Sequence, residues 1–344
     1  MANEFWTLRK ILPILTLLLG STFTWSQETP VSPGPLLPIE LADRKQWEPG
    51  TVQCDAVGNI TVLRKSHHEL IKVGQNGAVI SRMDVSGLAG LGDAEVISFA
   101  AGPNDETYVL ASHVVFYEVK RKDPNKPPLQ KRSHDLRPTL FRFDAYGGLV
   151  SSKPLGRKFE MPWIAVFDSG EFVLLDAALE KVPIANVYSA DGNLLKQVDL
   201  KKARLGLPAN TISWEVHLFG GGDRILILVQ QSDPKTETLV AAVSRDGEVL
   251  SAARLKLPKG DTLRDPRRMG EHLFGILEMG ADSDPREGMP YVEIDSDTGD
   301  VLHRYVFRNG RFPACNTPEG MSFFNVLDQR LEILTLQVQP ENRP

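Results

Sequence analysis

The sequence predicts an all-β fold built from repeated hairpins, and three observations lead to this prediction. Apolar and polar residues alternate in short runs, and no apolar helical period lasts beyond about three turns. The 344-residue chain contains 28 glycines and 24 prolines, which supply frequent turns. Hairpins recur about every 50 residues, a spacing in the range of four-stranded propeller blades. We therefore expect a β-propeller.

The composition limits the classes of protein to which the chain can belong. Hydrophobic residues make up 42% of the chain and charged residues 24%, which excludes wholesale disorder and a fibrous repeat. The formal net charge of −5 argues against nucleic acid as a general partner.

The first 26 residues have the pattern of a secretory signal peptide. Arg9 and Lys10 precede an apolar run from Ile11 to Leu19, which a small, polar stretch follows up to Ser26. The uncharged run over 11–25 is shorter than the roughly 20 residues that span a bilayer, so a retained anchor is the weaker alternative. We expect cleavage after Ser26 and a secreted or periplasmic mature protein without a membrane span.

A first kind of hairpin recurs six times along the chain. Each copy has a strand, a tight polar turn and a second apolar strand, and the copies lie at 52–63, 98–110, 164–176, 216–229, 269–278 and 323–337. The first apolar or aromatic residues after the turns are Ile60, Tyr108, Phe172, Ile225, Leu273 and Leu331. The longest step contains a basic, proline-rich insertion at 120–137, and without it a period of about 50 is maintained.

A second kind of hairpin follows each of the first five copies. Its turns lie at 75–79, 145–149, 190–194, 245–249 and 297–301. Asn-Gly and Asp-Gly recur there because tight hairpin turns need a positive φ, which glycine, and less often asparagine or aspartate, adopts. Each blade is therefore expected to contain four strands, A to D.

Two of the repeats resemble a known repeat family. Residues 55–63 (DAVGNITVL) and 168–176 (DSGEFVLLD) resemble the NHL-type repeats of six-bladed β-propellers, including secreted bacterial proteins of unknown function. The periodicity covers residues 47–339, and the motif match is good in those two blades. The resemblance implies a ring of six blades.

A six-membered ring needs a device that closes it. After Leu331 the chain has room for little more than a B strand, so we predict a three-stranded sixth blade whose outer strand comes from residues 36–41. Irregular rings of five or seven blades remain alternatives. The domain boundaries are then a signal peptide at 1–26, an N-terminal segment at 27–46 and one propeller domain at 47–340.

The two cysteines lie at opposite ends of the propeller domain. Cys54 ends strand A of the first blade and Cys315 precedes the sixth, and these blades are neighbours in a closed ring. One hypothesis is a disulfide across the seam, the place where the first and sixth blades meet and close the ring. The alternative is two separate buried thiols.

The basic insertion at 120–137 is one candidate binding element. The insertion contains only two aspartates. Its seven basic residues are Lys120, Arg121, Lys122, Lys126, Lys131, Arg132 and Arg137. Electrostatic capture of an acidic glycan, an anionic surface or an acidic partner is one interpretation. The alternative is a solvated loop that its prolines keep extended.

A second candidate site lies near the expected axis of the ring. Tryptophans precede three of the A strands, ionisable residues follow one of these tryptophans, and a pair of arginines lies at the corresponding entry to blade five. The candidate ligand-binding residues are Trp47, Trp163, Trp214, Glu215, His217, Arg267 and Arg268. The tryptophans could stack on a sugar or a peptide, or they could be core residues that pack one blade on the next.

The sequence contains no linear catalytic or metal-binding motif. This favours a monomeric, non-catalytic binding or scaffolding module without a cofactor or metal, whose partner is an unknown protein, peptide or glycan. The alternative is a propeller-fold hydrolase, lactonase or lyase with an axial, metal-dependent site, because such sites leave no linear motif.

Overall fold

The structure of the protein is a computed structural model. It describes residues 37–38, 47–64, 68–74, 78–88, 94–119, 129–135, 137–159, 162–176, 184–199, 214–231, 238–257, 261–278, 289–307, 311–317, 320–325 and 332–333. The expected signal peptide at 1–26 lies outside these residues.

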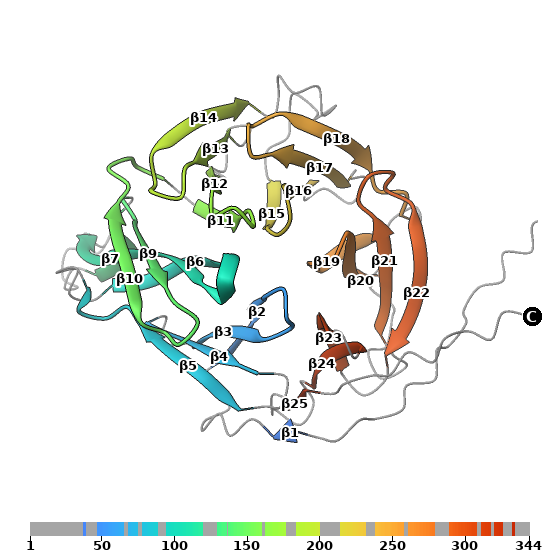
Figure 1. The fold of residues 1–344 in the computed structure, drawn as a ribbon, viewed down its shortest axis with the longest axis horizontal. Coiled ribbons are helices and arrows are strands. Elements are labelled where there is room, and N and C mark those ends of the chain that lie inside the picture. Colours follow the sequence, from blue (N-terminus) through green and yellow to red (C-terminus); the bar gives the residue numbers. More distant parts are fainter. Residues whose placement is uncertain are drawn as a thin grey trace, which may run out of the picture.

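In the described part of the chain, five antiparallel sheets surround a central axis, four with four strands each and one with five (Figure 1). Blade one contains β2 (Trp47–Cys54), β3 (Ile60–Arg64), β4 (Glu69–Val73) and β5 (Val79–Asp84). Blade two contains β6 (Ala94–Ala101), β7 (Thr107–Val119), β9 (Thr139–Phe143) and β10 (Leu149–Pro154). Blade three contains β11 (Pro162–Val166), β12 (Phe172–Asp176), β13 (Ile184–Tyr188) and β14 (Leu194–Asp199). Blade four contains β15 (Trp214–Phe219), β16 (Arg224–Gln231), β17 (Thr238–Ser244) and β18 (Val249–Arg254). Blade five contains β19 (Thr262–Met269), β20 (His272–Glu278), β21 (Met289–Asp295) and β22 (Val301–Phe307). The all-β propeller predicted from the sequence is confirmed.

Two short sheets fill the place between blade five and blade one (Figure 1). Strand β23 (Arg311–Thr317) contacts the inner strands β19 and β2 and pairs with β24 (Gly320–Asn325). Strand β25 (Glu332–Ile333) pairs with β1 (Leu37–Pro38), so a segment before blade one is hydrogen-bonded to the last strand that the structure describes. Strand β1 lies within the segment 36–41, for which we predicted a ring-closing strand. Among the described residues these four strands form two two-stranded sheets, not the single three-stranded sheet that we predicted.

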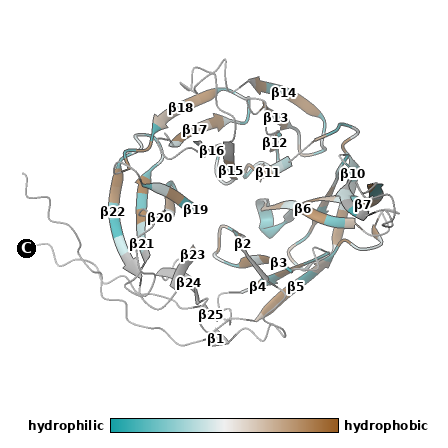
Figure 2. Ribbon diagram, turned by 180° about the vertical axis from the view of Figure 1, so that it is seen from behind, coloured by the Kyte–Doolittle hydropathy of each residue, from teal (hydrophilic) through white to brown (hydrophobic). Residues whose placement is uncertain are grey.

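The apolar core lies between neighbouring blades. The two middle strands of a blade are buried on both faces, which explains why β12 and β16 are almost continuous apolar runs. Val173 and Leu175 of β12, for example, pack with Ile225 and Ile227 of β16. Similar clusters join blades one and two, two and three, and four and five, and Figure 2 shows apolar residues along the strands of these blades.

In four of the second hairpins the turn glycine has a positive φ, as we expected. Their glycines have φ values between 73° and 84°, and they are Gly147, Gly192, Gly247 and Gly299. The residues before them have negative φ. At Gly147, Gly192 and Gly247 the glycine N–H donates to the carbonyl oxygen three residues before it, as in a type I turn followed by a G1 bulge, whereas the N–H of Gly299 donates to the carbonyl oxygen of Asp295, four residues before it. In each case a Cβ on the glycine would collide with the outer strand of the preceding blade. Glycine therefore serves both the turn and the packing of blades.

No helix in the described part of the chain is long and apolar enough to cross a membrane.

Candidate functional site

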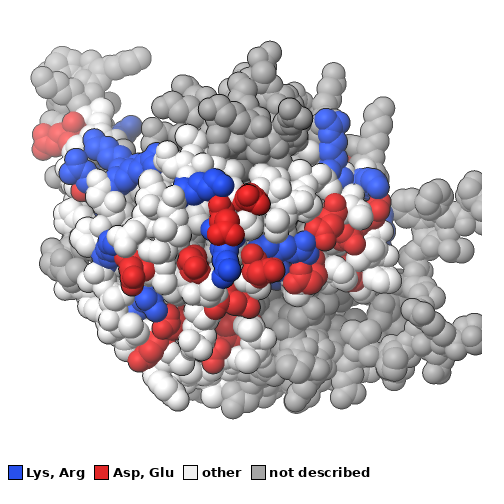
Figure 3. Space-filling model, turned by 45° about the horizontal axis from the view of Figure 1, so that its top comes forward, with Lys and Arg blue, Asp and Glu red and all other residues white. Residues whose placement is uncertain are grey.

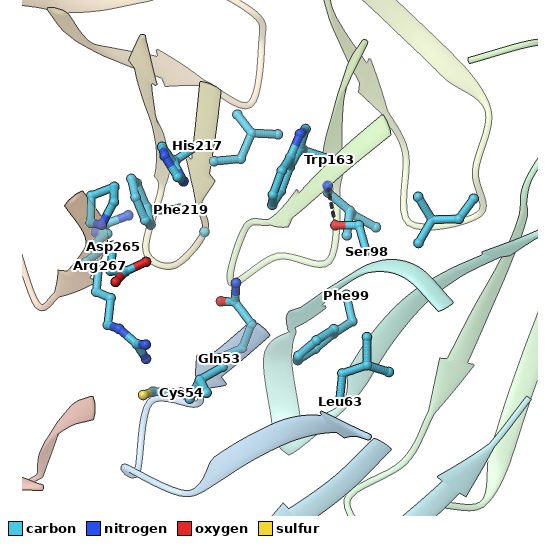
Figure 4. Close-up of a pocket in the computed structure, with 17 residues that line it drawn as sticks. Gln53, Cys54, Leu63, Ser98, Phe99, Trp163, His217, Phe219, Asp265 and Arg267 are labelled. Carbon is cyan, nitrogen blue, oxygen red and sulfur yellow. Dashed lines mark hydrogen bonds between the residues drawn. The ribbon is translucent and has the colours of Figure 1, made fainter. Parts of the chain in front are cut away.

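The inner strands of the five blades enclose a cavity of about 170 Å³ on the axis (Figure 4). Residues of β2, β6, β11, β15 and β19 line it, together with Leu63 of β3. The polar, charged or aromatic side chains that line it include those of Gln53, Ser98, Trp163, His217, Asp265 and Arg267. The cavity thus combines residues that are far apart in the sequence.

Irregular pairing turns side chains of the inner strands toward the axis. The register of β19 against β20 shifts between Arg264 and Arg267, and Asp265, inside this bulge, has a φ of 47°. The register of β6 shifts likewise between Val96 and Ser98. Bulges re-aim side chains and break pairing, which here places the Asp265 carboxylate at the open centre (Figure 4).

Three aromatic side chains form one wall of the cavity. The ring centroids of Trp163 and His217 are 6.1 Å apart at an interplanar angle of 53°, and those of His217 and Phe219 are 6.2 Å apart at 11°. Trp163 belongs to blade three and the other two to blade four, so the wall crosses a blade boundary. Trp163 is 38% exposed, which leaves part of its ring open to a ligand.

Charged groups of blade five lie on another side of the cavity. The Asp265 carboxylate lies 3.6 Å from the guanidinium Nε of Arg264. Burial lowers the pKa of the Arg267 guanidinium, while the nearby Tyr291 and Asp265 oppose this shift. Arg267 is thus a poorly hydrated cation next to the cavity.

Arg268 joins blades four and five. Its guanidinium Nη1 donates to the carbonyl oxygens of Gly221 (2.7 Å) and Arg224 (2.8 Å), and its Nε donates to that of Gly270 (2.8 Å). Its Nη2 lies 3.2 Å from Glu271. Arg268, which we predicted as a ligand-binding residue, lines the cavity, and these contacts also fix it at the boundary between the two blades.

The structure brings some of the other predicted axial residues together. Trp163, His217 and Arg267 line the cavity, as Arg268 does. Trp47 and Trp214 begin the inner strands β2 and β15, and Glu215 follows Trp214, but the side chains of these three residues lie outside the described part.

Sequence reasoning missed three polar residues of the cavity. Gln53, Ser98 and Asp265 line it, and none belongs to a motif. The dipeptide Asp265-Pro266 within an otherwise regular strand was a usable signal for Asp265, because proline inside a strand indicates an edge or a bulge.

The basic insertion contains a strand where we considered an extended loop. β8 (Leu129–His134) pairs with the second half of β7 over Val114–Val119 and extends this hairpin beyond blade two. Phe116 and Tyr117 on β7 are 62% and 49% exposed, and Lys131 and Arg137 are exposed as well. The side chain of Arg132 is not described, and Lys120, Arg121, Lys122 and Lys126 lie outside the described residues.

Ion pairs between blades account for many of the surface charges. Arg224 of blade four lies 2.6 Å from Glu271 and 2.7 Å from Asp297 of blade five, and Lys256 lies 2.7 Å from Asp300. On the face in Figure 3, Lys and Arg side chains accordingly lie beside Asp and Glu side chains.

A disulfide joins Cys54 of β2 to Cys315 of β23, with the Cα atoms 5.8 Å apart. It links the first blade to the strand beside it across the seam, and Cys54 also lines the cavity. Within the described ranges, no three His, Cys, Asp or Glu side chains form a group that could hold a metal ion.

Comparisons with solved structures find similar chains at low sequence identity. A Bacteroides caccae protein of unknown function is 14% identical, with a TM-score of 0.46 over 76% of this chain and 83% of that chain. A streptogramin B lyase is 11% identical, with a TM-score of 0.44 over 88% and 97%. A virginiamycin B lyase from Staphylococcus aureus is 9% identical, with a TM-score of 0.44 over 88% and 98%. No protein-family model matches this chain, and no curated protein matches it in sequence.

Proposed function

We propose that the protein is a secreted or periplasmic β-propeller that acts as a non-catalytic binding or scaffolding module, with the axial cavity receiving part of its partner. The observation that carries this proposal is the half-exposed ring of Trp163 beside His217, in a cavity that five blades build. Rigid aromatic surfaces next to a few polar groups are typical of binding sites.

The size of the cavity limits what it can hold. A volume of about 170 Å³ corresponds to about six water molecules at roughly 30 Å³ each. Pockets for whole small molecules usually have about 300–1,000 Å³. The cavity therefore suits a single ring or side chain of a larger partner, whose remainder lies on the face of the propeller.

Site-specific photo-crosslinking in the organism that produces the protein tests this proposal. A photoreactive amino acid at Trp163 should capture a partner, and the same amino acid at Leu250, on the outer rim of blade four, serves as the matched control. Equal capture at both positions, or none at Trp163, would contradict the proposal. A captured partner that is chemically converted would instead favour the hydrolase, lactonase or lyase alternative.

The proposal includes removal of residues 1–26 and a monomeric mature chain. Intact mass and N-terminal sequencing of the secreted protein should give a chain that starts at Gln27, and light scattering should give the mass of one copy.

We also propose that β23, β24, β25 and β1 form a sixth, incomplete blade of the NHL type. The contacts of β23 with both β19 and β2, and the pairing of β25 with β1, support this count. Deletion of residues 27–41 should then lower the Tm of the mature protein. An unchanged Tm would show that β1 does not hold the ring closed.

The basic insertion at 120–137 is proposed to attract an acidic partner. Its seven basic and two acidic residues give it a net charge of +5 in a chain of net charge −5. Charge reversal by Lys131→Glu should lower the salt concentration at which the protein elutes from an anionic polysaccharide matrix, more than Lys158→Glu outside the insertion does. Equal shifts for both variants would contradict this role.

A further inference from the structure

The charges around the axial cavity compensate one another. Asp265 and Arg267 both line the cavity, and the negative charge of Asp265 favours the protonated form of the Arg267 guanidinium, which burial disfavours. Arg268 also lines the cavity, but its guanidinium donates to backbone carbonyl oxygens and to Glu271. A neutral ligand therefore fits the cavity without disturbing the partners of these charges.

The aromatic wall of the cavity restricts the shape of the ligand. The ring centroid of Trp163 lies 6.1 Å from that of His217, whose ring is stacked near Phe219, and part of the Trp163 ring remains exposed. This ring is a flat, apolar surface that its neighbours hold in place. Such a surface binds the apolar face of another ring.

Two polar side chains point toward the open centre beside Trp163 (Figure 4). Gln53 of β2 is half-buried, and its amide offers both donors and an acceptor. The Asp265 side chain is 42% exposed, and its contact with Arg264 at 3.6 Å leaves acceptor sites on the carboxylate for a ligand. A ligand that replaces water here must therefore donate hydrogen bonds to Asp265 and can exchange them with Gln53.

These groups together favour a neutral sugar over a peptide side chain. A tyrosine side chain has a flat ring but only one hydroxyl, and phenylalanine and proline have none, so each would cover Gln53 or Asp265 without replacing its hydrogen bonds to water. A pyranose ring combines an apolar face of C–H groups with several hydroxyls at its edge. An acidic sugar would bring a second carboxylate into the cavity beside Asp265, and like charges repel.

We propose that the axial cavity binds a neutral hexopyranose at the end of a glycan. One face of the sugar ring lies against Trp163, and its hydroxyls bond to Gln53 and Asp265. The cavity of about 170 Å³ admits a single ring, so the rest of the glycan lies over the face of the propeller. This inference rests on the proposed binding function and names the class of its ligand.

Titration calorimetry of the mature protein tests the assignment with matched probes. The neutral probes are the methyl glycosides of glucose, mannose and galactose, and each is compared with its uronide, which carries a carboxylate in place of the hydroxymethyl group. N-Acetyltyrosinamide represents a peptide side chain. We expect at least one neutral glycoside to bind saturably, at least threefold more tightly than its uronide and than N-acetyltyrosinamide. Higher salt should leave the affinity for the neutral glycoside unchanged.

Variants separate the contribution of each group. Trp163→Leu keeps an apolar side chain but removes the flat ring, and it should weaken the binding of the neutral glycoside at least tenfold. Gln53→Ala should weaken it at least threefold, and it keeps the test decisive if Trp163→Leu does not fold. Asp265→Asn removes the charge and keeps an oxygen acceptor, so it should reduce the preference for the neutral sugar over its uronide to less than twofold. Leu250→Ser on the outer rim is the matched control and should leave every affinity unchanged.

The outcomes distinguish this inference from the proposed function. Equal or tighter binding of the uronide overturns the neutral ligand, and unchanged affinity in both Trp163→Leu and Gln53→Ala overturns the placement of the sugar. Tighter binding of N-acetyltyrosinamide than of every glycoside overturns the sugar and keeps the binding module. Binding of no glycoside, together with capture of a partner at Trp163 in the photo-crosslinking experiment, has the same meaning. Binding of no probe and no capture at Trp163 overturn both.

Discussion

Replacement of Lys72 by methionine should destabilise the propeller more than the loss of any surface ion pair. Lys72 Nζ lies 2.8 Å from Asp55 Oδ2, and the two side chains are only 2% and 3% exposed. The ammonium also donates to the carbonyl oxygen of Asp105 at 2.9 Å. One lysine of β4 thus holds the first turn of blade one and a turn of blade two.

The magnitude follows from what the substitution leaves behind. The Asp55 carboxylate keeps three donors, namely the backbone N–H groups of Val57 and Asn59 and the side-chain amide of Asn59. Removal of one partner from a buried pair costs about 3–5 kcal/mol because an uncompensated charge remains. Since these donors still stabilise the charge, we expect a value near 3 kcal/mol. That is a large fraction of the roughly 5–15 kcal/mol by which domains are stable.

Equilibrium unfolding of the mature protein in guanidinium chloride measures this loss. The matched control is Arg82→Met, whose partner Glu69 lies 3.1 Å away in an exposed pair, and we expect it to cost less than about 1 kcal/mol. The double variant Lys72→Met/Asp55→Asn removes both charges and should cost less than the sum of the single variants. Equal losses for Lys72→Met and the control, or strict additivity in the double variant, would refute the reasoning.

Three further predictions concern the turns, the seam and the core. Gly299→Ala should destabilise the protein more than Gly156→Ala in thermal unfolding, because both glycines have positive φ but only the first has no room for a Cβ; equal losses would show that backbone strain alone acts. Reduction of the Cys54–Cys315 disulfide, which closes a loop of 261 residues, should lower the free energy of unfolding by about 2–5 kcal/mol in denaturant titrations with and without reductant, and an unchanged midpoint would contradict this. Burial raises the pKa of Tyr108 to about 12, and the pKa of an unfolded tyrosine is about 10. The neutral phenol therefore makes its full contribution to the free energy of unfolding below pH 10, and this contribution decreases by about 2.7 kcal/mol as the pH rises to 12, because the two pKa values differ by about two. The free energy of unfolding of Tyr108→Phe should depend less on pH over this range, and the same pH dependence in both proteins would disprove the assignment.

The repeated architecture was predictable because it depends on patterns of neighbouring residues in the sequence. The strands of blades three to five lie close to the expected hairpins, since alternation and glycine turns act over a few residues. The turn type was not predictable from Asp-Gly alone. In the turn after β9, Asp144 Oδ1 accepts the N–H groups of Tyr146 and Gly148, which favours a type I turn with the glycine in the left-handed region.

The candidate site was predictable only in part, because it is assembled across blades. Trp163 and His217 were singled out as aromatic and ionisable residues at inner strands, and they do meet. Gln53 carries no signature in the sequence, and for Asp265 only the following proline signals a bulge, since the place of both side chains depends on the arrangement of the blades around the axis. The three backbone carbonyls that accept hydrogen bonds from the Arg268 guanidinium were not predictable, because their positions depend on the arrangement of two blades and not on residue types in the sequence.

The sequence by itself determined the all-β class, the repeat of about 50 residues and the positions of the turn glycines, because these depend on neighbours along the chain. Only the tertiary structure decided which side chains share the axial cavity, the pairing of β1 with β25 and the strand β8 in the basic insertion. The physical reason is that these contacts join residues tens to hundreds of positions apart. Their energy depends on burial and on the angle between blades, and no local pattern records either quantity.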